Sequence, residues 1–512
     1  MSTAASSHAT GISDARVAVQ GVAAASYPCA PPFHPNVAYP EYVGPIGKEP
    51  NLVYAGIREL LRHLDLDSAN YGKPGWNPLG EIVGPGDKVV LKPNLLWHSH
   101  KYRPTEWEQI ITHGSVVRAV LDYVLIALHG RGEVVIADGP QQDANWQVIM
   151  ERTGLDRVCD DASLRGGAPV RLLDLRDLWI DVRGDVVYRR VPLSGDPLGG
   201  TVVNLGRHSR LAGHLGEGRF YGADYDMAET NAHHSDGRQE YRLSRTALGA
   251  DVFINLPKLK THKKVGVTLC LKNLVGINNG RNWLPHHTEG DPSNGGDQFP
   301  DASLKNRSER WGVRALQGVS LKHPRGFAPL FRLVKAVAAP VWGKKRQVIR
   351  NGNWHKNDTC WRMVHDINRC LLYSNGAAFP AARAKRFFAV VDGIVAGHGN
   401  GPAEADRLEA GVLIAGTNPV AVDCVGARLM GFDPQKIPML REAFASSPLP
   451  LAGFAYDDIQ VVSGHPGWNR KLRDVRPEDC FSFRPHFGWK GHIEWDGQAE
   501  DRGHLQAVAS CQ

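Results

Sequence analysis

The segment 251–276, DVFINLPKLKTHKKVGVTLCLKNLVG, places several positive charges directly after an apolar run. Its side chains that could do chemistry are Lys258, Lys260, His262, Lys272 and Asn273. Lysine ammonium groups bind phosphate and carboxylate, and a histidine exchanges protons near neutral pH. The pattern therefore indicates an anion site with a proton-transfer group beside it.

Similar chemistry follows three other strand-like runs. Lys92 and Asn94 come after the run 87–91, Asp138 follows 133–137, and Asp392 follows 386–391 and leads into the loop GHGNGP that contains Gly399. Ligands bind at the carboxyl ends of strands in open α/β sheets, so parallel neighbouring strands would bring these residues to one edge. The alternative is that the lysines are solvated rim residues and that Asp-Gly is an ordinary turn.

From this convergence we assign roles to two groups of residues. The catalytic group is His262 as acid and base, Lys260, and Asp138 or Asp392 to orient the histidine. The group that would bind substrate is Lys92, Asn94, Lys258, Lys272, Asn273 and Gly399. Glycine permits close backbone approach to a ligand, although a flexible turn explains the GHGNGP glycines equally well.

The elements that must position these residues alternate between strand and helix. Strands are predicted at 16–22, 87–96, 133–139, 170–175, 251–256, 386–393 and 412–417, and helices at 51–64, 113–129, 141–152 and 418–431. Near-continuous apolar strands of this kind are typical of central parallel strands covered on both sides. The sequence therefore predicts an α/β fold, with a mainly parallel central sheet, helices on both faces and two insertions.

The chain divides by composition into six parts. The α/β domain begins with 1–175 and is interrupted by a polar, Gly-rich insertion at 176–243. It continues through 244–300, which holds the lysine-rich motif and a His/Asp loop, is interrupted again by a basic insertion at 301–356, and ends with 357–484 before a tail at 485–512.

The basic insertion is the most uneven feature of the charge distribution. The whole chain carries a net charge of +7, whereas 305–356 holds thirteen Lys and Arg against one acid, Glu309. Peripheral contact with an anionic membrane, or packing of 327–342 on the domain, would each suit this segment. Nucleic-acid binding is disfavoured, because no recognised nucleic-acid fold or aromatic platform accompanies the charge.

Metal and cofactor sites have weaker support. Glu229 and His233 would share a helix face and form the candidate pair for a divalent metal, but a solvated acidic loop is the simpler interpretation. No two of the eight cysteines have CxxC spacing, which disfavours an iron–sulphur cluster. No secretory signal or membrane-spanning run is evident, so we expect a cytoplasmic protein, with peripheral membrane contact left open.

The motifs VVLKPNLL, VVIADGP, INLPKLKTHKKVGVTLCLKNLVG, VVDGIVAGHGNGP and LIAGTNPVAVDCVGARLMG occur in an order that resembles the domain-of-unknown-function-362 family. The resemblance runs from about 85 to 435, outside the insertions. It identifies Asp423 as a further motif position, expected either as a buried partner of a lysine or facing solvent. Lys263 and Lys264 fall outside the motif and are expected at the surface. Some relatives carry a ferredoxin-like cysteine module, which this chain lacks.

Three functions remain open from the sequence. The first is an enzyme that acts on an anionic small molecule through the Lys/His/Asp site. The second is a non-catalytic accessory protein that docks on an anionic membrane or a lipid-linked glycan through 305–356. The third is a redox protein.

Overall fold

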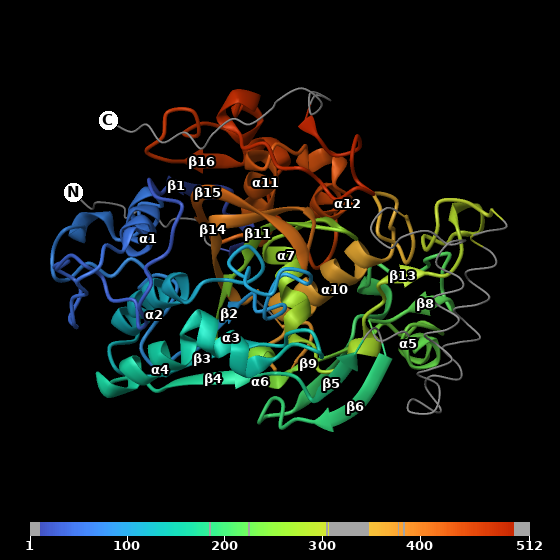
Figure 1. The fold of residues 1–512 in the computed structure, drawn as a ribbon, viewed down its shortest axis with the longest axis horizontal. Coiled ribbons are helices and arrows are strands. Elements are labelled where there is room, and N and C mark those ends of the chain that lie inside the picture. Colours follow the sequence, from blue (N-terminus) through green and yellow to red (C-terminus); the bar gives the residue numbers. More distant parts are fainter. Residues whose placement is uncertain are drawn as a thin grey trace.

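The computed structural model describes residues 11–183, 186–223, 226–303, 306, 348–376, 378–381 and 384–495. Its largest element is a ten-stranded sheet with the order β16-β1-β15-β14-β10-β2-β3-β4, to which β11 and β12 are added beside β14. Figure 1 shows this order running from β16 at the top to β4 at the bottom. The strands are β1 Arg16–Gly21, β2 Lys88–Pro93, β3 Glu133–Asp138, β4 Val170–Asp174, β10 Val252–Leu256, β11 Lys258–His262, β12 Gly266–Thr268, β14 Arg386–Asn400, β15 Glu404–Gly416 and β16 Gln460–Val462.

The sheet is mostly parallel. Strands β14, β10, β2, β3 and β4 form a continuous parallel block, and β1 pairs in parallel with β16. Strand β15 is antiparallel to both β1 and β14 and joins the two parallel parts. The predicted α/β class with a mainly parallel sheet is therefore confirmed.

Helices cover both faces of this sheet because successive strand residues point to opposite sides. On β2, Val89 and Leu91 belong to one apolar core, whereas Val90 belongs to the other. The first core contains α1 Leu52–His63, α2 Gly114–Leu128, α3 Trp146–Thr153 and α4 Leu155–Leu164; the second contains α6 Arg245–Leu248, α7 Cys270–Asn273, α10 Cys360–Leu372, α11 Pro419–Leu429 and α12 Pro438–Arg441.

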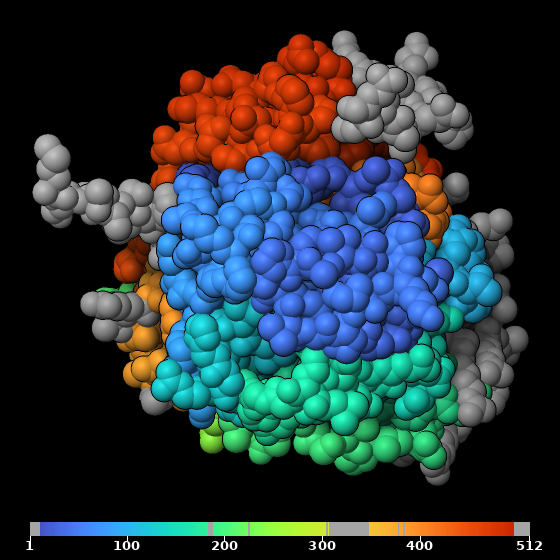
Figure 2. Space-filling model, turned by 90° about the vertical axis from the view of Figure 1, so that its left-hand side faces the viewer, coloured from blue at the N-terminus to red at the C-terminus, as the bar shows by residue number. Residues whose placement is uncertain are grey.

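The N-terminal segment before α1 lies over the helices of the first face. Arg118 in α2 donates a hydrogen bond to the carbonyl of Pro32, and His34 lies 3.6 Å from Asp161 in α4. Figure 2 shows the blue N-terminal part of the chain at the surface on this side of the molecule, next to the teal part. This path brings residues near the start of the chain to the central sheet.

The first insertion folds into small sheets beside the main one. Strand β5 Leu178–Arg183 pairs with β6 Val186–Pro192, and β7 Gly200–Asn204 pairs with β9 Glu240–Ser244. Strand β8 Phe220–Tyr221, which precedes α5 Met227–His233, pairs with β13 His287–Thr288 from the His/Asp loop. The basic insertion lies mostly outside the described residues, including the whole of 327–342.

The stretch GHGNGP, predicted as a loop, lies mostly in a strand, and the lysine-rich stretch forms a strand of its own. The lysine-rich stretch forms β11, in which all five residues are buried, because it adds to β14 in parallel and to β12 in antiparallel fashion. Strand β14 continues to Asn400 and so includes most of GHGNGP, because β15 pairs with it along that whole length. Helix α11, by contrast, begins at Pro419 as predicted, with the Asn418 side chain capping it.

Candidate functional site

Lys92, at the end of β2, forms a buried ion pair with Asp138, at the end of β3. The distance from Lys92 Nζ to Asp138 Oδ1 is 2.6 Å, and the backbone N–H groups of Leu95 and Gly139 also donate to this carboxylate. Because β2 and β3 are parallel neighbours, the two strand ends meet as predicted. Burial lowers the pKa of Lys92, and Asp138 opposes that effect.

Two asparagine side chains connect this pair to β11. Asn94 Nδ2 donates to Asn273 Oδ1 over 2.9 Å, and the same Asn273 oxygen accepts from Lys92 at 3.2 Å. On its other side, Asn94 Oδ1 accepts from Lys260 Nζ at 3.1 Å. The sequence-predicted residues Lys92, Asn94, Asp138, Lys260 and Asn273 therefore form one continuous hydrogen-bonded network.

Lys260 is fully buried and has no carboxylate partner among the described residues. Its ammonium group donates only to Asn94 Oδ1 and to the backbone carbonyl of Ile110. Desolvation and repulsion from Lys258 lower the pKa of Lys260 well below its ordinary value. A charge buried without a counter-charge is costly.

A second orphan group lies beside Lys260. Lys260 and Thr268 are directly opposite each other in the β11–β12 pair, so their side chains project from the same face. Thr268 is 3 % exposed, and its hydroxyl has no hydrogen-bond partner in the described part of the chain. A hydroxyl and an ammonium group are together suited to hold an oxyanion.

Lys258 differs from Lys260 because it has a carboxylate partner. Its Nζ lies 2.8 Å from Asp392 Oδ2, and neither side chain is exposed. Asp392 also accepts from the Tyr27 hydroxyl (2.6 Å) and from the backbone N–H of His113 (2.9 Å), and the Tyr27 ring stacks on His113 at 4.0 Å. In this second network the charges of Lys258 and Asp392 cancel, and the stacked rings of Tyr27 and His113 lie against the pair.

The opposite side of Lys260 is strongly cationic. Lys272, in α7, is 8 % exposed, and its ammonium group makes no hydrogen bond or ion pair with the described residues. Burial and repulsion from Lys272 lower the pKa of both His262 and His286 well below the ordinary value for histidine. His262 Nδ1 accepts from the backbone N–H of Lys264. Both imidazoles are therefore neutral at physiological pH.

The expected orientation of His262 by a carboxylate is not what the structure has. Asp138 is bonded to Lys92 and Asp392 to Lys258, and neither carboxylate bonds to the imidazole. The β11 residues that reach these strand ends are Lys258 and Lys260, whereas His262 is the last residue of β11 and lies beyond them.

Other motif positions have structural tasks. Gly399 has φ +75° and lies beside Asp406 and Arg484, with its carbonyl accepting from the Thr261 hydroxyl. Asp423 does not pair with a lysine. It accepts from the backbone N–H groups of Cys270 and Leu271 at the start of α7, and burial raises its pKa to about 7.

The two lysines that were expected at the surface differ in exposure. Lys263 is exposed, whereas Lys264 is 9 % exposed and donates to the carbonyl of Asn351. Burial lowers the pKa of Lys264 to about 8. The expectation for Lys264 is therefore wrong, because the loop at 350–353 folds over it.

Glu229 and His233 lie on α5 and both face the same short helical turn, Arg281–Trp283. Glu229 accepts from the Trp283 indole and the Asn282 amide, and His233 stacks on Trp283 with ring centroids 3.3 Å apart. His233 also lies 2.9 Å from Glu240. No group of three or more His, Cys, Asp or Glu side chains suited to a metal ion occurs in the described residues.

Comparison with known proteins adds a family to this geometry. The model of the family "Domain of unknown function (DUF362)" matches residues 89–198 and 212–428, which include both strand-end networks except Tyr27. The chain belongs to the DUF362 family. The match covers more than half of the chain and includes β3, β4, β10, β11, β12, β14 and β15 of the main sheet.

One relative and one solved structure match parts of the chain. A thylakoid-associated protein of Synechocystis sp. is 25 % identical over 362 residues, which is 71 % of this chain and 68 % of that protein. A crystal structure of a Thermotoga maritima protein aligns with a TM-score of 0.30 and 10 % identity, and the match spans 73 % of this chain and 58 % of that one. Within the described residues, no helix has the length and apolar character needed to cross a bilayer.

Proposed function

We propose that this DUF362 protein is an enzyme that acts on a small molecule bearing a phosphate or carboxylate, and that the anion binds between Lys260 and Lys272. The observation that carries the proposal is that these two lysines are buried without a carboxylate partner in the described residues, whereas Lys92 and Lys258 each have one. A bound anion would supply the missing counter-charge.

The roles within the site follow from this division. Lys260, Lys272 and the Thr268 hydroxyl would contact the anion, while the Lys92–Asp138 and Lys258–Asp392 pairs would hold β11 in place. His262, as a neutral imidazole, would accept a proton from the substrate. Asn94 and Asn273 would fix the position of the Lys260 ammonium group through their hydrogen bonds.

Access is best from the side of Lys272 and His262. These two residues keep 8 % and 7 % exposure, whereas Lys258 and Lys260 are 0 % exposed. His286 and Arg281 on the same side are partly exposed. An anion would therefore meet Lys272 first and reach Lys260 as it enters.

The proposal predicts that binding takes up protons. Burial and, after it, neighbouring cations lower the pKa values of Lys260, Lys272 and His262, and an anion among them would raise all three. Calorimetric titration with inorganic phosphate and with succinate, in buffers of different ionisation enthalpy at pH 8, would measure this uptake. Binding without net proton uptake would contradict the charge argument.

Substitutions of the two lysines test anion binding, and substitution of His262 tests catalysis. Lys260→Met and Lys272→Met should each weaken binding of the anion about tenfold or more, because each removes a charge-assisted contact. Lys88→Met, at the exposed opposite end of β2, is the matched control. Mass spectrometry of the purified protein would identify a retained anion. Once a substrate is known, full activity in both His262→Ala and Lys260→Ala would overturn the proposal.

A second candidate function is peripheral attachment to an anionic membrane through 305–356. It is supported by the local excess of thirteen basic residues over one acid and by the name of the Synechocystis relative, a thylakoid-associated protein. Pelleting with vesicles that contain anionic lipid, compared with neutral vesicles and repeated at high salt, would test it. Equal pelleting with both vesicle types would refute this attachment.

A further inference from the structure

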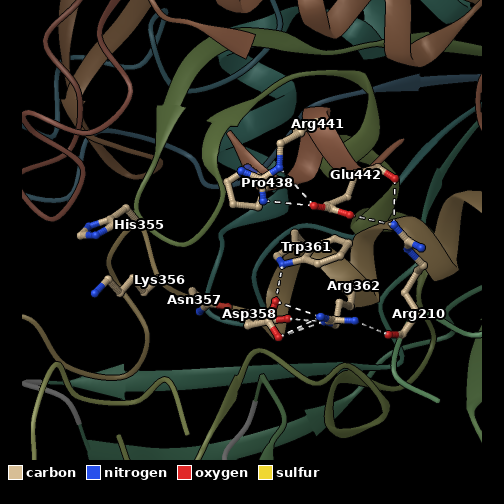
Figure 3. Close-up of a pocket in the computed structure, with 10 residues that line it drawn as sticks. All are labelled: Arg210, His355, Lys356, Asn357, Asp358, Trp361, Arg362, Pro438, Arg441 and Glu442. Atoms are coloured by element: carbon tan, nitrogen blue, oxygen red, sulfur yellow. Dashed lines mark hydrogen bonds and ion pairs between the residues drawn. The ribbon is translucent and has the colours of Figure 1, made fainter. Parts of the chain in front are cut away.

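A cavity of about 340 Å³ opens on the other side of α10 from the lysine site. Its walls come from the segment 355–358, the first turn of α10, α12 and Arg210, and none of the strand-end residues lines it. Figure 3 shows the side chains around it, with Trp361 between Arg362 and the Arg441–Glu442 pair. A volume of this size suits a small molecule.

The lining is polar and carries more positive than negative charge. Four cations, Arg210, Lys356, Arg362 and Arg441, face two acids, Asp358 and Glu442. A formal surplus of two positive charges therefore surrounds the cavity before the nearby His355 is counted. Such a surplus in a concave site favours a ligand with two negative charges.

Both acids already form hydrogen bonds or ion pairs with other residues of the cavity wall. Asp358 accepts from Nε and one terminal nitrogen of the Arg362 guanidinium and from the Trp361 indole. Burial alone would raise the pKa of Asp358, but hydrogen bonds from His214 and Arg362 hold it below its ordinary value. Glu442 accepts from Arg441 at 3.0 Å and from Arg210 at 3.4 Å. Neither carboxylate is left to repel an anion strongly.

Several donors remain available, by contrast. One terminal nitrogen of Arg210 donates to Glu442, while the Arg210 Nε atom is buried and has no acceptor in the described part of the chain. The Lys356 ammonium group is exposed and lies 5.8 Å from the Trp354 ring. Arg441 is half exposed, and its bonds to Glu442 engage Nε and one terminal nitrogen only. These donors come from three different segments and face one cavity.

We propose that this cavity binds a phosphate dianion carried by a small soluble molecule, at a second site separate from the Lys260–Lys272 site. Guanidinium groups match the geometry of phosphate oxygens and make paired, charge-assisted hydrogen bonds to them. The polar walls and the 5 % exposure of Trp361 leave little apolar surface, so the phosphate supplies the recognition. An apolar ligand would leave the buried Arg210 Nε without an acceptor.

The wall of this cavity is also tied to the first site. The side chain of Asn357 donates to the carbonyl of His286, and the next residues, Thr359 and Cys360, lead into α10. The two sites therefore share one loop while using different charged groups.

The test is calorimetric titration of the full chain with inorganic pyrophosphate at low ionic strength. Arg441→Gln and Lys356→Gln change rim residues whose removal leaves the core intact, and each should weaken binding about tenfold. Arg476→Gln, an exposed arginine paired with Glu478 and Asp479 elsewhere on the surface, is the control and should bind as wild type.

The outcomes separate the two sites. Retained pyrophosphate binding in Lys260→Met, together with its loss in Arg441→Gln/Lys356→Gln, supports the second site whether or not the first binds an anion. Wild-type affinity in the double variant overturns the proposal, as does binding abolished by Lys260→Met alone. Binding that weakens equally in Arg476→Gln reflects general surface charge and also overturns it.

Discussion

Two lysines on the same strand should respond in opposite ways to the same substitution. Lys258 and Lys260 both lie on β11 and are both fully buried, but Lys258 has Asp392 at 2.8 Å and Lys260 has only neutral acceptors. Replacement by methionine keeps an unbranched side chain that is one atom shorter and removes the charge. The contrast tests whether the charge of Lys260 serves stability or a ligand.

The magnitudes follow from what each substitution leaves behind. Lys258→Met leaves the Asp392 carboxylate buried without its counter-charge, which costs about 3–5 kcal/mol, with hydrogen bonds from Tyr27 and His113 favouring the lower end. Lys260→Met loses two hydrogen bonds worth about 1 kcal/mol each. It also removes an unpaired buried charge, and replacing buried charges by apolar groups is neutral or stabilising by about 1–4 kcal/mol. We therefore expect a net change within about 2 kcal/mol of wild type.

Urea titration followed by tryptophan fluorescence and by circular dichroism would measure both changes, and coincidence of the two probes would show that the transition is cooperative. The double variant Lys258→Met/Asp392→Leu should recover part of the loss seen in Lys258→Met, because no charge is then left unpaired. Equal destabilisation by Lys258→Met and Lys260→Met would refute the reasoning, since it would mean that the unpaired ammonium group stabilises the fold.

Three further predictions concern pH and packing. The free energy of unfolding should rise between pH 7 and 9, because burial lowers the pKa values of Lys264 and Lys385 to about 8 while unfolded lysines keep their protons to about 10.5. The gain is about 1 kcal/mol for each lysine at pH 9. Lys385→Met should flatten this rise in urea titrations, and an unchanged slope would contradict the prediction. Stability should fall from pH 7 to 5, because burial lowers the pKa of His365 to about 3, so the unfolded chain binds a proton at this residue before the folded protein does. His365→Gln should remove about 2 kcal/mol of the loss at pH 5. An equal loss in the variant and the wild type would show that His365 is not its cause. Gly397→Ala should destabilise the protein by about 1–3 kcal/mol, because a Cβ there would lie 2.8 Å from the Gln109 carbonyl and 3.0 Å from Lys260 Cβ. The control is thermal unfolding of Gly75→Ala, where φ is not positive and no atom lies within 4 Å, and an equal effect in both variants would contradict the clash.

The sequence predicts the part of the site that depends on strand order. Lys92, Asp138 and Asn94 follow two parallel strands, and such ends meet at one edge whatever the loops do. The network that links them to Lys260 and Asn273 follows from the same rule. Strand alternation on β11 also predicts that Lys258 and Lys260 share a face, which is how they reach different partners on one side of the sheet.

The remaining contacts depend on chain paths that local patterns do not encode. Tyr27 and His113 reach Asp392 across 365 and 279 residues, and neither lies in a motif. Tyr27 reaches Asp392 because the N-terminal segment lies over α2 and α4, and His113 reaches it as the N-cap residue of α2. Thr268 could have been found, because a period-two pattern across a short turn places it opposite Lys260. The burial of Lys264 could not, because it depends on the loop at 350–353.

The charge excess of β11 has a different meaning once its burial is known. On a surface, lysines in a row attract anions weakly and through solvent. In the interior, each charge needs a partner, and the fold supplies Asp138 and Asp392 for two of the four lysines in this region. Selection for stability alone would favour apolar side chains at Lys260 and Lys272. The unpaired positions are therefore where the chain gives up stability, and in proteins such positions are the ones that bind or react.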